Sequence, residues 1–141
     1  MKISIIFWSG TGNTESMAKA IKEGAESAGA EVTLKAVDKA SEADVTGADV
    51  TLLGCPSMGD EVLEDTEFDP FIESIEKKIN GKKMALFGSY GWGDGQWMRD
   101  WTDRMKNAGV TLVTESLIVN ETPSGSDLDL CRSFGENAAR S

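Results

Sequence analysis

The sequence predicts an α/β protein with a doubly wound, five-stranded parallel sheet and helices on both of its faces. Short apolar runs such as Ile3–Phe7 alternate with segments whose apolar residues recur every three or four positions, as on one face of a helix. Strands that alternate with helices through short loops form parallel sheets of this kind. The length of 141 residues suits one domain with a full core, so we expect residues 1–141 to form a single domain.

The first half of the chain supplies three of these strands. Met17, Ala18 and Ile21 mark the buried face of the first helix, and Gly29 is a residue type that commonly ends a helix. The predicted elements are a strand at 2–7, a helix at 14–28, an edge strand at 31–37, a short polar connection at 41–47 and a strand at 49–53.

The second half supplies the other two strands. Asp69 and Pro70 predict the start of a helix, because Asp often caps helices and Pro suits their first turn. The predicted elements are a long loop at 57–67, a helix from Pro70 to Gly81, a strand at 84–87, a glycine-rich loop at 88–95, a helix from Trp97 to near Gly109, a kinked fifth strand at 110–113 and 117–119, and a closing helix at 128–138.

The loop after the first strand has the character of an anion site. Its free helix-start amides and its hydroxyl side chains would face an anion, and its glycines let the backbone curl around one. Glu15 replaces the third glycine of the dinucleotide fingerprint, and the lysine of a phosphate-binding Walker loop is absent. The loop therefore suits a compact monophosphate, although an ordinary polar loop with a capped helix is an equally good interpretation of this stretch alone. Its residues are Trp8, Ser9, Gly10, Thr11, Gly12, Asn13 and Thr14.

Two further unusual loops follow the third and fourth predicted strands. In doubly wound sheets, ligands bind at the carboxyl ends of the strands, so we expect these loops and the first one to converge. Met58 and Trp92 lie in these loops and suit the two sides of a flat ring, whereas Trp97 and Trp101 are expected to pack in the core. The alternative for Met58 and Trp92 is that both fold back on the core. A monophosphate beside a flat ring suggests a mononucleotide, and FMN fits both ends.

Composition excludes several classes of function. The net charge of −10 argues against binding to nucleic acid or to anionic membranes and favours basic partners. The absence of histidine removes the commonest general base and metal ligand, and we expect Cys55 and Cys131 to be free, buried thiols. No apolar run approaches the ~20 residues of a membrane span, and no signal-peptide pattern begins the chain, so we expect a cytoplasmic protein.

The three loops together resemble those of the flavodoxins, and closely those of the short-chain clostridial type. The matching stretches are Trp8–Glu15, Gly54–Glu61 and Leu86–Gly95, and the resemblance covers essentially the whole chain. Long-chain members have an insertion within the fifth strand, for which Leu112–Leu117 leaves no room. The resemblance implies a strand order of 2-1-3-4-5 and FMN as the cofactor.

The resemblance also implies roles for individual residues. Ser9–Thr14 would bind the FMN phosphate, Met58 and Trp92 would flank the isoalloxazine, and the Glu61 carboxylate would accept a hydrogen bond from N3. No residue is expected to be catalytic or to bind a metal, and Pro56 and Ser57 receive no role. The expected cofactor-binding residues are Trp8, Ser9, Gly10, Thr11, Gly12, Asn13, Thr14, Met58, Gly59, Asp60, Glu61, Ser89, Tyr90, Gly91, Trp92, Gly93 and Asp94.

The turn at Gly59 and Asp60 would meet the flavin N5. A type II turn places positive φ at its second central residue, and we expect Asp60 to adopt that conformation when the Gly59 carbonyl accepts from N5–H of the semiquinone. Gly59 itself can take positive φ when the peptide between the two residues is rotated the other way.

Acidic residues crowd the loop at the proposed ring. We expect Glu64, Asp65 and Glu67 to be exposed, and a solvated face is the simpler interpretation of the run from Glu64 to Asp69. Beside a flavin, this charge would disfavour the anionic hydroquinone and attract basic redox partners. The sequence therefore predicts a monomeric, low-potential one-electron carrier that cycles between semiquinone and hydroquinone and is not an enzyme.

We expect its partners to be ferredoxin-type reductases and oxidoreductases with basic docking surfaces, and neither nucleic acid nor membrane. The alternative function is a flavodoxin-like FMN-dependent quinone reductase. Such an enzyme needs open space over the ring for its substrate, and Trp92 and Met58 would fill that space.

Overall fold

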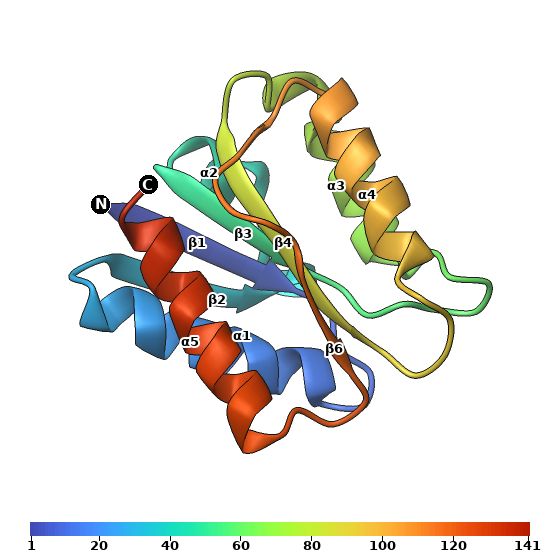
Figure 1. The fold of residues 1–141 in the computed structure, drawn as a ribbon. Coiled ribbons are helices and arrows are strands. Elements are labelled where there is room, and N and C mark those ends of the chain that lie inside the picture. The colour runs from blue at the N-terminus through green and yellow to red at the C-terminus, as the bar shows by residue number, and fades with distance from the viewer.

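The computed structural model describes residues 1–141 as one parallel sheet with helices on both faces (Figure 1). The strand order is β2-β1-β3-β4-β5, as predicted, and β6 also pairs with β4. Both β5 and β6 lie parallel to β4, so they are the two parts of the predicted kinked strand. The strands are β1 (Lys2–Phe7), β2 (Glu31–Ala36), β3 (Val50–Gly54), β4 (Lys83–Tyr90), β5 (Thr111–Leu112) and β6 (Leu117–Asn120).

The helices divide the apolar core into two layers. Helices α1 and α5 cover one face of the sheet and α3 and α4 cover the other, with α2 on the side of α3 and α4 (Figure 1). Ile21 and Phe134 belong to the first layer, and Ile72, Trp97 and Trp101 to the second. The helices are α1 (Asn13–Ser27), α2 (Glu42–Thr46), α3 (Phe68–Ile75), α4 (Gln96–Asn107) and α5 (Gly125–Ala139), with 3₁₀ turns at Val37–Lys39 and Glu76–Lys78.

Two glycines allow α1 and α5 to pack with their backbones in contact. A Cβ on Gly24 would lie 1.9 Å from the carbonyl oxygen of Arg132, and one on Gly135 would lie 2.1 Å from that of Ile21. Any larger residue at either position would push the helices apart. This packing fixes α1 against the sheet, and so it also fixes the start of α1 beside the end of β1.

The fourth strand is longer than predicted. β4 runs to Tyr90, so Gly88, Ser89 and Tyr90 belong to a strand rather than to the predicted loop. They are extended because β6 pairs with them, which the short apolar run at 84–87 did not reveal. Gly88 also has to be glycine, since a Cβ there would lie 2.2 Å from the carbonyl oxygen of Cys55.

The prediction for the start of the third helix was wrong. α3 begins at Phe68, two residues earlier than expected, and Asp69 forms an ion pair with Arg104 of α4 instead of capping the helix. The cap is the Glu64 carboxylate, which accepts hydrogen bonds from the backbone N–H groups of Thr66, Glu67 and Phe68 at 2.9, 2.8 and 2.9 Å. A carboxylate at a helix start satisfies free amides and lies favourably in the field of the helix dipole.

The expectation that Glu64 is exposed was therefore also wrong, since only 5% of its surface is accessible. Burial raises the pKa of the Glu64 carboxyl, but the hydrogen bonds from Thr66, Phe68 and Glu67 outweigh it and leave the pKa below its ordinary value of 4.5. Asp65 and Glu67 are exposed, as expected. Of the three acids, Glu64 is thus a structural residue.

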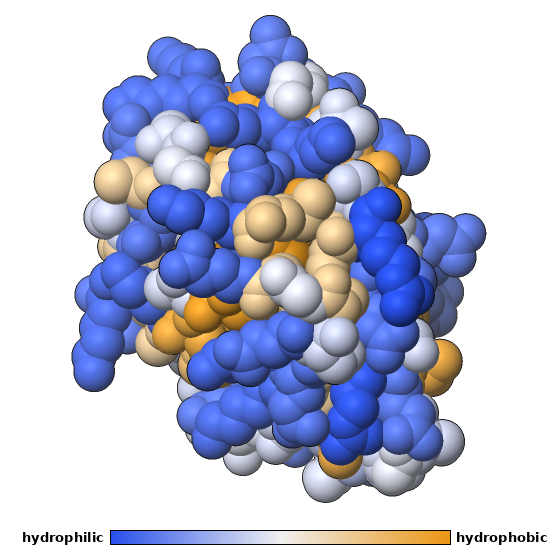
Figure 2. Space-filling model, turned by 90° about the vertical axis from the view of Figure 1, so that its left-hand side faces the viewer, coloured by the Kyte–Doolittle hydropathy of each residue, from blue (hydrophilic) through white to orange (hydrophobic).

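The outer surface is largely hydrophilic. On the face shown in Figure 2, small hydrophobic patches are surrounded by hydrophilic residues, in keeping with 24 acidic and 14 basic residues in the chain. None of the helices has both the length and the apolar character that crossing a membrane would require.

We predict that Glu64→Gln lowers the free energy of unfolding by about 1–3 kcal/mol at pH 7, because a neutral amide holds the α3 amides less strongly. The folded-state pKa of Glu64 is lowered, so its contribution is complete above pH 4.5 and is lost as the pH falls through the folded-state value. Urea denaturation followed by circular dichroism should therefore show that the free energies of unfolding of the wild type and the variant become equal in acid.

Asp65→Asn is the matched control, since it removes one charge from the same loop at an exposed site. A control that loses as much stability as Glu64→Gln would attribute the effect to net charge and not to the cap.

Candidate functional site: a cavity at the carboxyl ends of the strands

The loops after β1 and β3 and the end of β4 meet around one cavity of about 270 Å³. It lies at the carboxyl end of the sheet, toward which the arrowhead of β1 points in Figure 1. The expected convergence of the three segments is thus confirmed. The cavity is lined by Trp8, Ser9, Gly10, Thr11, Asn13, Thr14, Pro56, Ser57, Met58, Ser89, Tyr90, Gly91 and Glu121.

The loop before α1 forms a cradle of free hydrogen-bond donors. Ser9 Oγ accepts from the backbone N–H groups of Gly12 and Glu15 at 3.1 and 3.3 Å, which holds the loop in a tight curl. Gly12 has φ +95°, a conformation that side-chain-bearing residues rarely adopt. The backbone N–H groups of Thr11, Asn13 and Thr14 have no partner in the chain.

The cradle contains no cation, since neither Lys nor Arg lines the cavity. Thr14 Oγ1 and Ser89 Oγ lie 2.9 Å apart in a buried hydrogen bond, which joins the start of α1 to the end of β4. Free amides at a helix start, hydroxyls and the helix dipole together favour an anionic group. The residues present therefore fit a phosphate held by neutral donors, as the sequence predicted.

The loop after β3 forms a hairpin over Met58–Val62. Met58 and Val62 exchange backbone hydrogen bonds of 2.9 and 3.0 Å and enclose a turn of Gly59, Asp60 and Glu61. Gly59 has φ +49° and Glu61 has φ +56°, whereas Asp60 does not have positive φ. The expected positive φ of Asp60 is thus absent from this conformation, and Glu61 is the left-handed residue of the turn.

The Glu61 side chain is held in an unusual environment. Its Oε1 atom is buried and has no hydrogen-bond partner in the protein. A Cβ on Gly93 would lie 2.2 Å from this oxygen, so glycine at 93 allows the close approach of the two loops. A buried carboxylate oxygen without a donor is costly, and a ligand N–H would remove that cost. The structure therefore fits the predicted role of Glu61 as an acceptor for a flavin N–H.

Several expected site residues do not line the cavity. Trp92 lies on the loop at 91–95 with 62% of its surface exposed, so the indole does not face Met58 across the cavity. Asp94 is turned to Arg99, with which it forms an ion pair of 2.9 Å. The remaining expected residues outside the lining are Gly12, Gly59, Asp60, Glu61 and Gly93.

Sequence analysis missed three lining residues, Pro56, Ser57 and Glu121. Ser57 is brought in because its N–H donates to the Ser89 carbonyl at 3.0 Å, which extends the pairing of β3 with β4. Glu121 has φ +58° and donates its N–H to the Tyr90 carbonyl at 2.7 Å. No motif marks Glu121 in the sequence, because its place depends on the pairing of β6 with β4.

Trp8 closes one side of the cavity. Its Nε1–H donates to Glu67 Oε1 at 3.3 Å, so an acid of the long loop fixes the indole. A Cβ on Gly10 would come within 3.0 Å of the Trp8 ring, which explains the small residue at that position. Glu67 therefore has a structural contact in addition to its charge.

The cysteines supply no reactive group. Cys55 and Cys131 are free and buried, as expected. Burial raises the pKa of the Cys55 thiol to about 12, and burial likewise raises that of Cys131 to about 12. A thiol of such high pKa is almost never ionised at neutral pH, so neither is a nucleophile. No group of three or more acidic or cysteine side chains could hold a metal ion.

Comparison with known proteins agrees with this geometry. The family model described as Flavodoxin matches residues 5–135. Flavodoxin from Clostridium beijerinckii is 49% identical over 137 residues, which cover 97% of this chain and 99% of that protein. Flavodoxin from Megasphaera elsdenii is 45% identical over 138 residues, with 98% of both chains covered.

A solved structure gives the same result. The solution structure of two-electron reduced Megasphaera elsdenii flavodoxin superimposes with a TM-score of 0.91 at 45% identity, covering 99% of both chains. The relatives at high identity are electron carriers rather than enzymes, which does not favour the quinone reductase alternative. The chain therefore belongs to the flavodoxin family, whose members bind FMN and transfer electrons.

Proposed function

We propose that this flavodoxin, as one FMN-binding domain of residues 1–141, holds FMN in the cavity at the carboxyl ends of β1, β3 and β4 and passes single electrons between redox proteins. The observation that carries this assignment is the buried Glu61 oxygen without a donor, on the hairpin beside a cradle of free amides. When bound, FMN supplies a flavin ring that accepts and releases electrons. The chain supplies the binding groups and the surrounding charge.

The phosphate end of the cofactor is assigned to the loop before α1. The free amides of Thr11, Asn13 and Thr14 and the hydroxyls of Ser9 and Thr11 would bind its oxygens. Ser9 Oγ already accepts two hydrogen bonds, so its own proton is available to a phosphate oxygen. Because no cation takes part, binding depends on neutral donors and on the dipole of α1.

The ring end is assigned to Met58, Glu61 and the segment from Ser89 to Asp94. Met58 lines the cavity, and Glu61 supplies an acceptor. Trp92 is exposed on a loop that contains three glycines, so a modest movement of that loop would bring its indole over a ring. Asp60, Asp65 and Glu121 are exposed carboxylates near this end and would disfavour additional negative charge on it.

The partners are proposed to be redox proteins with basic docking surfaces, such as ferredoxin-type reductases and oxidoreductases. The protein is proposed to act as a monomer in the cytoplasm. Support comes from the net charge of −10 and from acids at the site that have no cation partner, Asp60, Asp65 and Glu121 among them. Opposite charge speeds encounter and favours a defined orientation.

The visible spectrum and a dithionite titration of the purified protein test this function. We expect a flavin double band and uptake of electrons in two separate one-electron stages. A protein without flavin colour would overturn the cofactor assignment, and a single two-electron stage would favour the quinone reductase.

Replacing Thr11 with Ala should weaken FMN binding about ten- to hundredfold, because a hydrogen bond to a charged group contributes roughly 1.5–3 kcal/mol. Riboflavin has no phosphate, so its affinity should scarcely change. Quenching of flavin fluorescence by the apoprotein measures the dissociation constants of FMN and of riboflavin. Equal losses for the two ligands would show that Thr11 does not contact the phosphate.

Replacing Glu61 with Leu should weaken FMN about ten- to hundredfold through loss of the acceptor. The FMN-free variant should be no less stable than the wild type, since the unpartnered buried carboxylate is removed. Fluorescence titration and urea denaturation give the two quantities, and Glu61→Gln, which keeps a carbonyl acceptor, is the control. A Leu variant that loses stability without FMN would make Glu61 a structural residue.

Replacing Asp60 with Val should lower the potential of the first electron by roughly 20–65 mV, with FMN still bound. A β-branched residue fits the present turn, in which residue 60 lacks positive φ, but opposes a rotated turn that needs it. Spectroelectrochemical titration measures the potential.

Asp60→Asn is the matched control, because it removes the same charge while tolerating positive φ. Loss of the charge alone would raise the potential, so a Val variant whose potential matches that of Asn would contradict the peptide rotation.

A further inference from the structure

A second concave region lies between α3 and α4, and the hairpin borders it at one end. Two cavities of about 280 and 660 Å³ adjoin there, because Asp100 and Arg104 line both. The smaller is bordered by the hairpin residues Glu61 and Val62 and by Leu63 after them, and the larger extends to the last turn of α4. No residue lines both this region and the FMN cavity, and Glu61 is the one residue of this region that is also assigned to the flavin ring. We call it the α3–α4 groove.

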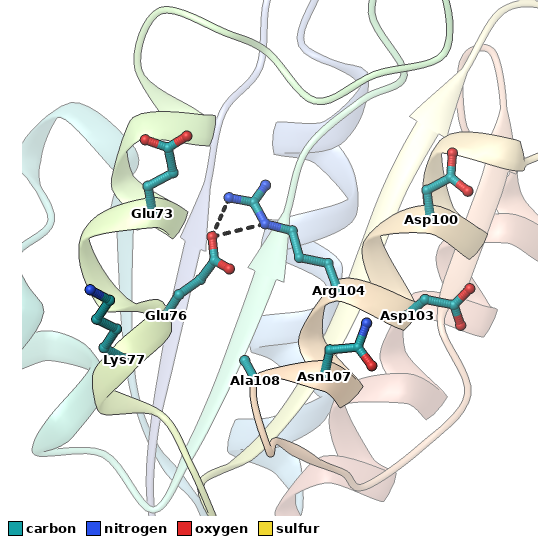
Figure 3. A pocket seen from close by; sticks show the side chains of 8 residues that line it. All are labelled: Glu73, Glu76, Lys77, Asp100, Asp103, Arg104, Asn107 and Ala108. Atoms are coloured by element: carbon teal, nitrogen blue, oxygen red, sulfur yellow. Dashed lines mark hydrogen bonds and ion pairs between the residues drawn. The ribbon is translucent and has the colours of Figure 1, made fainter.

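The groove is strongly acidic. Its lining contains two basic residues, Lys77 and Arg104, against seven acids. Arg104 reaches from α4 to Glu76, the first residue of the 3₁₀ turn after α3, with a bond of 2.9 Å from its Nε (Figure 3). Arg104 also pairs with Asp69 of α3. The other five acids have no cation partner, namely Glu61, Asp65, Glu73, Asp100 and Asp103.

A second observation points to an occupant with hydrogen-bond acceptors. Trp101 lines the smaller cavity, only 2% of its surface is exposed, and its Nε1–H has no hydrogen-bond partner. The other buried indole, Trp97, donates to the Cys55 carbonyl at 3.2 Å, so an unpaired indole N–H is not a general feature of this core. A buried donor without an acceptor costs free energy that an incoming carbonyl oxygen would recover.

The groove also offers apolar surface. Val62 is 53% exposed, and Leu63 is partly buried beside Trp97 and Trp101. Lysine and arginine side chains bury their methylene stems on such surface while the charged group remains at a polar rim. A metal ion is a poor alternative occupant, since no three of the acidic side chains are placed to hold one.

We propose that the α3–α4 groove is a docking channel for a lysine- or arginine-rich segment of the redox partner, with a main-chain carbonyl of that segment accepting from Trp101 Nε1–H. The proposal rests on the proposed function and adds to it a site apart from the rim of the flavin cavity. The segment's charges meet the unpaired acids other than Glu61, which is assigned to the flavin, and its stems cover Val62 and Leu63. Because the hairpin forms one end of the groove, a bound segment lies directly beside the proposed flavin site.

Hexalysine, added to the FMN-loaded protein, tests the proposal. It carries main-chain carbonyls, methylene stems and positive charges. In ¹H–¹⁵N correlation spectra the four tryptophan indole N–H signals can be assigned with single Trp→Phe variants. We expect the signal of Trp101 to shift on titration, and those of residues along α3 and α4 with it.

The variant Glu73→Gln/Asp100→Asn removes one unpaired acid from each wall of the groove. It should weaken hexalysine binding roughly 2- to 30-fold, the range for two exposed ion pairs. The matched control is Glu26→Gln/Glu31→Gln, which removes two exposed, unpaired acids at sites outside the groove and should bind hexalysine as the wild type does.

Two results would overturn the proposal: equal weakening by the control pair, or a Trp101 indole signal that stays in place at saturation. Flavin absorbance and the dithionite titration are recorded on the same samples. Loss of flavin or of one-electron uptake would count against the proposed function. Intact flavin chemistry without the expected response to hexalysine would count against the groove alone.

Discussion

The Glu64 carboxylate is the interaction on which the functional half of the molecule depends. It accepts from the backbone N–H groups of Thr66, Glu67 and Phe68, where α3 begins. The Glu64 nitrogen also lies 3.5 Å from the sulfur of Cys55, the residue after β3. The hairpin at Met58–Val62 is therefore held at both ends, by the pairing of Ser57 with Ser89 on one side and by this cap on the other. The same cap sets the start of α3, and Asp69 one residue into that helix is thereby placed to meet Arg104. One buried acid thus fixes both the ring side of the cavity and a wall of the α3–α4 groove.

The phosphate side depends on a different constraint, which is backbone contact between α1 and α5. Gly24 and Gly135 allow that contact, and it holds the amino end of α1 beside the end of β1. The free amides of the loop are then presented without any cation to balance a bound anion. A phosphate bound there keeps its charge, and that charge adds to the field of the acids around the ring end. Both ends of the site therefore disfavour the negative charge that a flavin acquires when it gains electrons.

Sequence reasoning predicted the fold, the strand order and the meeting of the three loops, because each depends on local periodicity or on the general topology of parallel sheets. It was wrong where a distant partner decides the local structure. Ser89 and Tyr90 are strand residues because β6 pairs with them, and Glu121 lines the cavity for the same reason. Glu64 resembled its exposed neighbours in sequence, and only the position of the α3 amides makes it a cap. The positive φ at Glu61 rather than Asp60 follows from a three-residue turn closed by Met58 and Val62, whose length the sequence does not encode.

The acidic residues of this chain fall into two groups, those with a partner inside the protein and those without one. The net charge alone does not distinguish these groups. Glu64 is satisfied by amides and Asp69 by Arg104, so their removal would leave donors or a cation unpaired inside the fold. Glu61 and Asp65 have no such partner, and repulsion between like charges opposes folding. The presence of acids that destabilise the free protein is explained if a ligand or a partner protein supplies positive charge or a hydrogen-bond donor to them. These acids lie around the hairpin and along the adjoining groove, where we propose that the cofactor and a partner protein bind side by side.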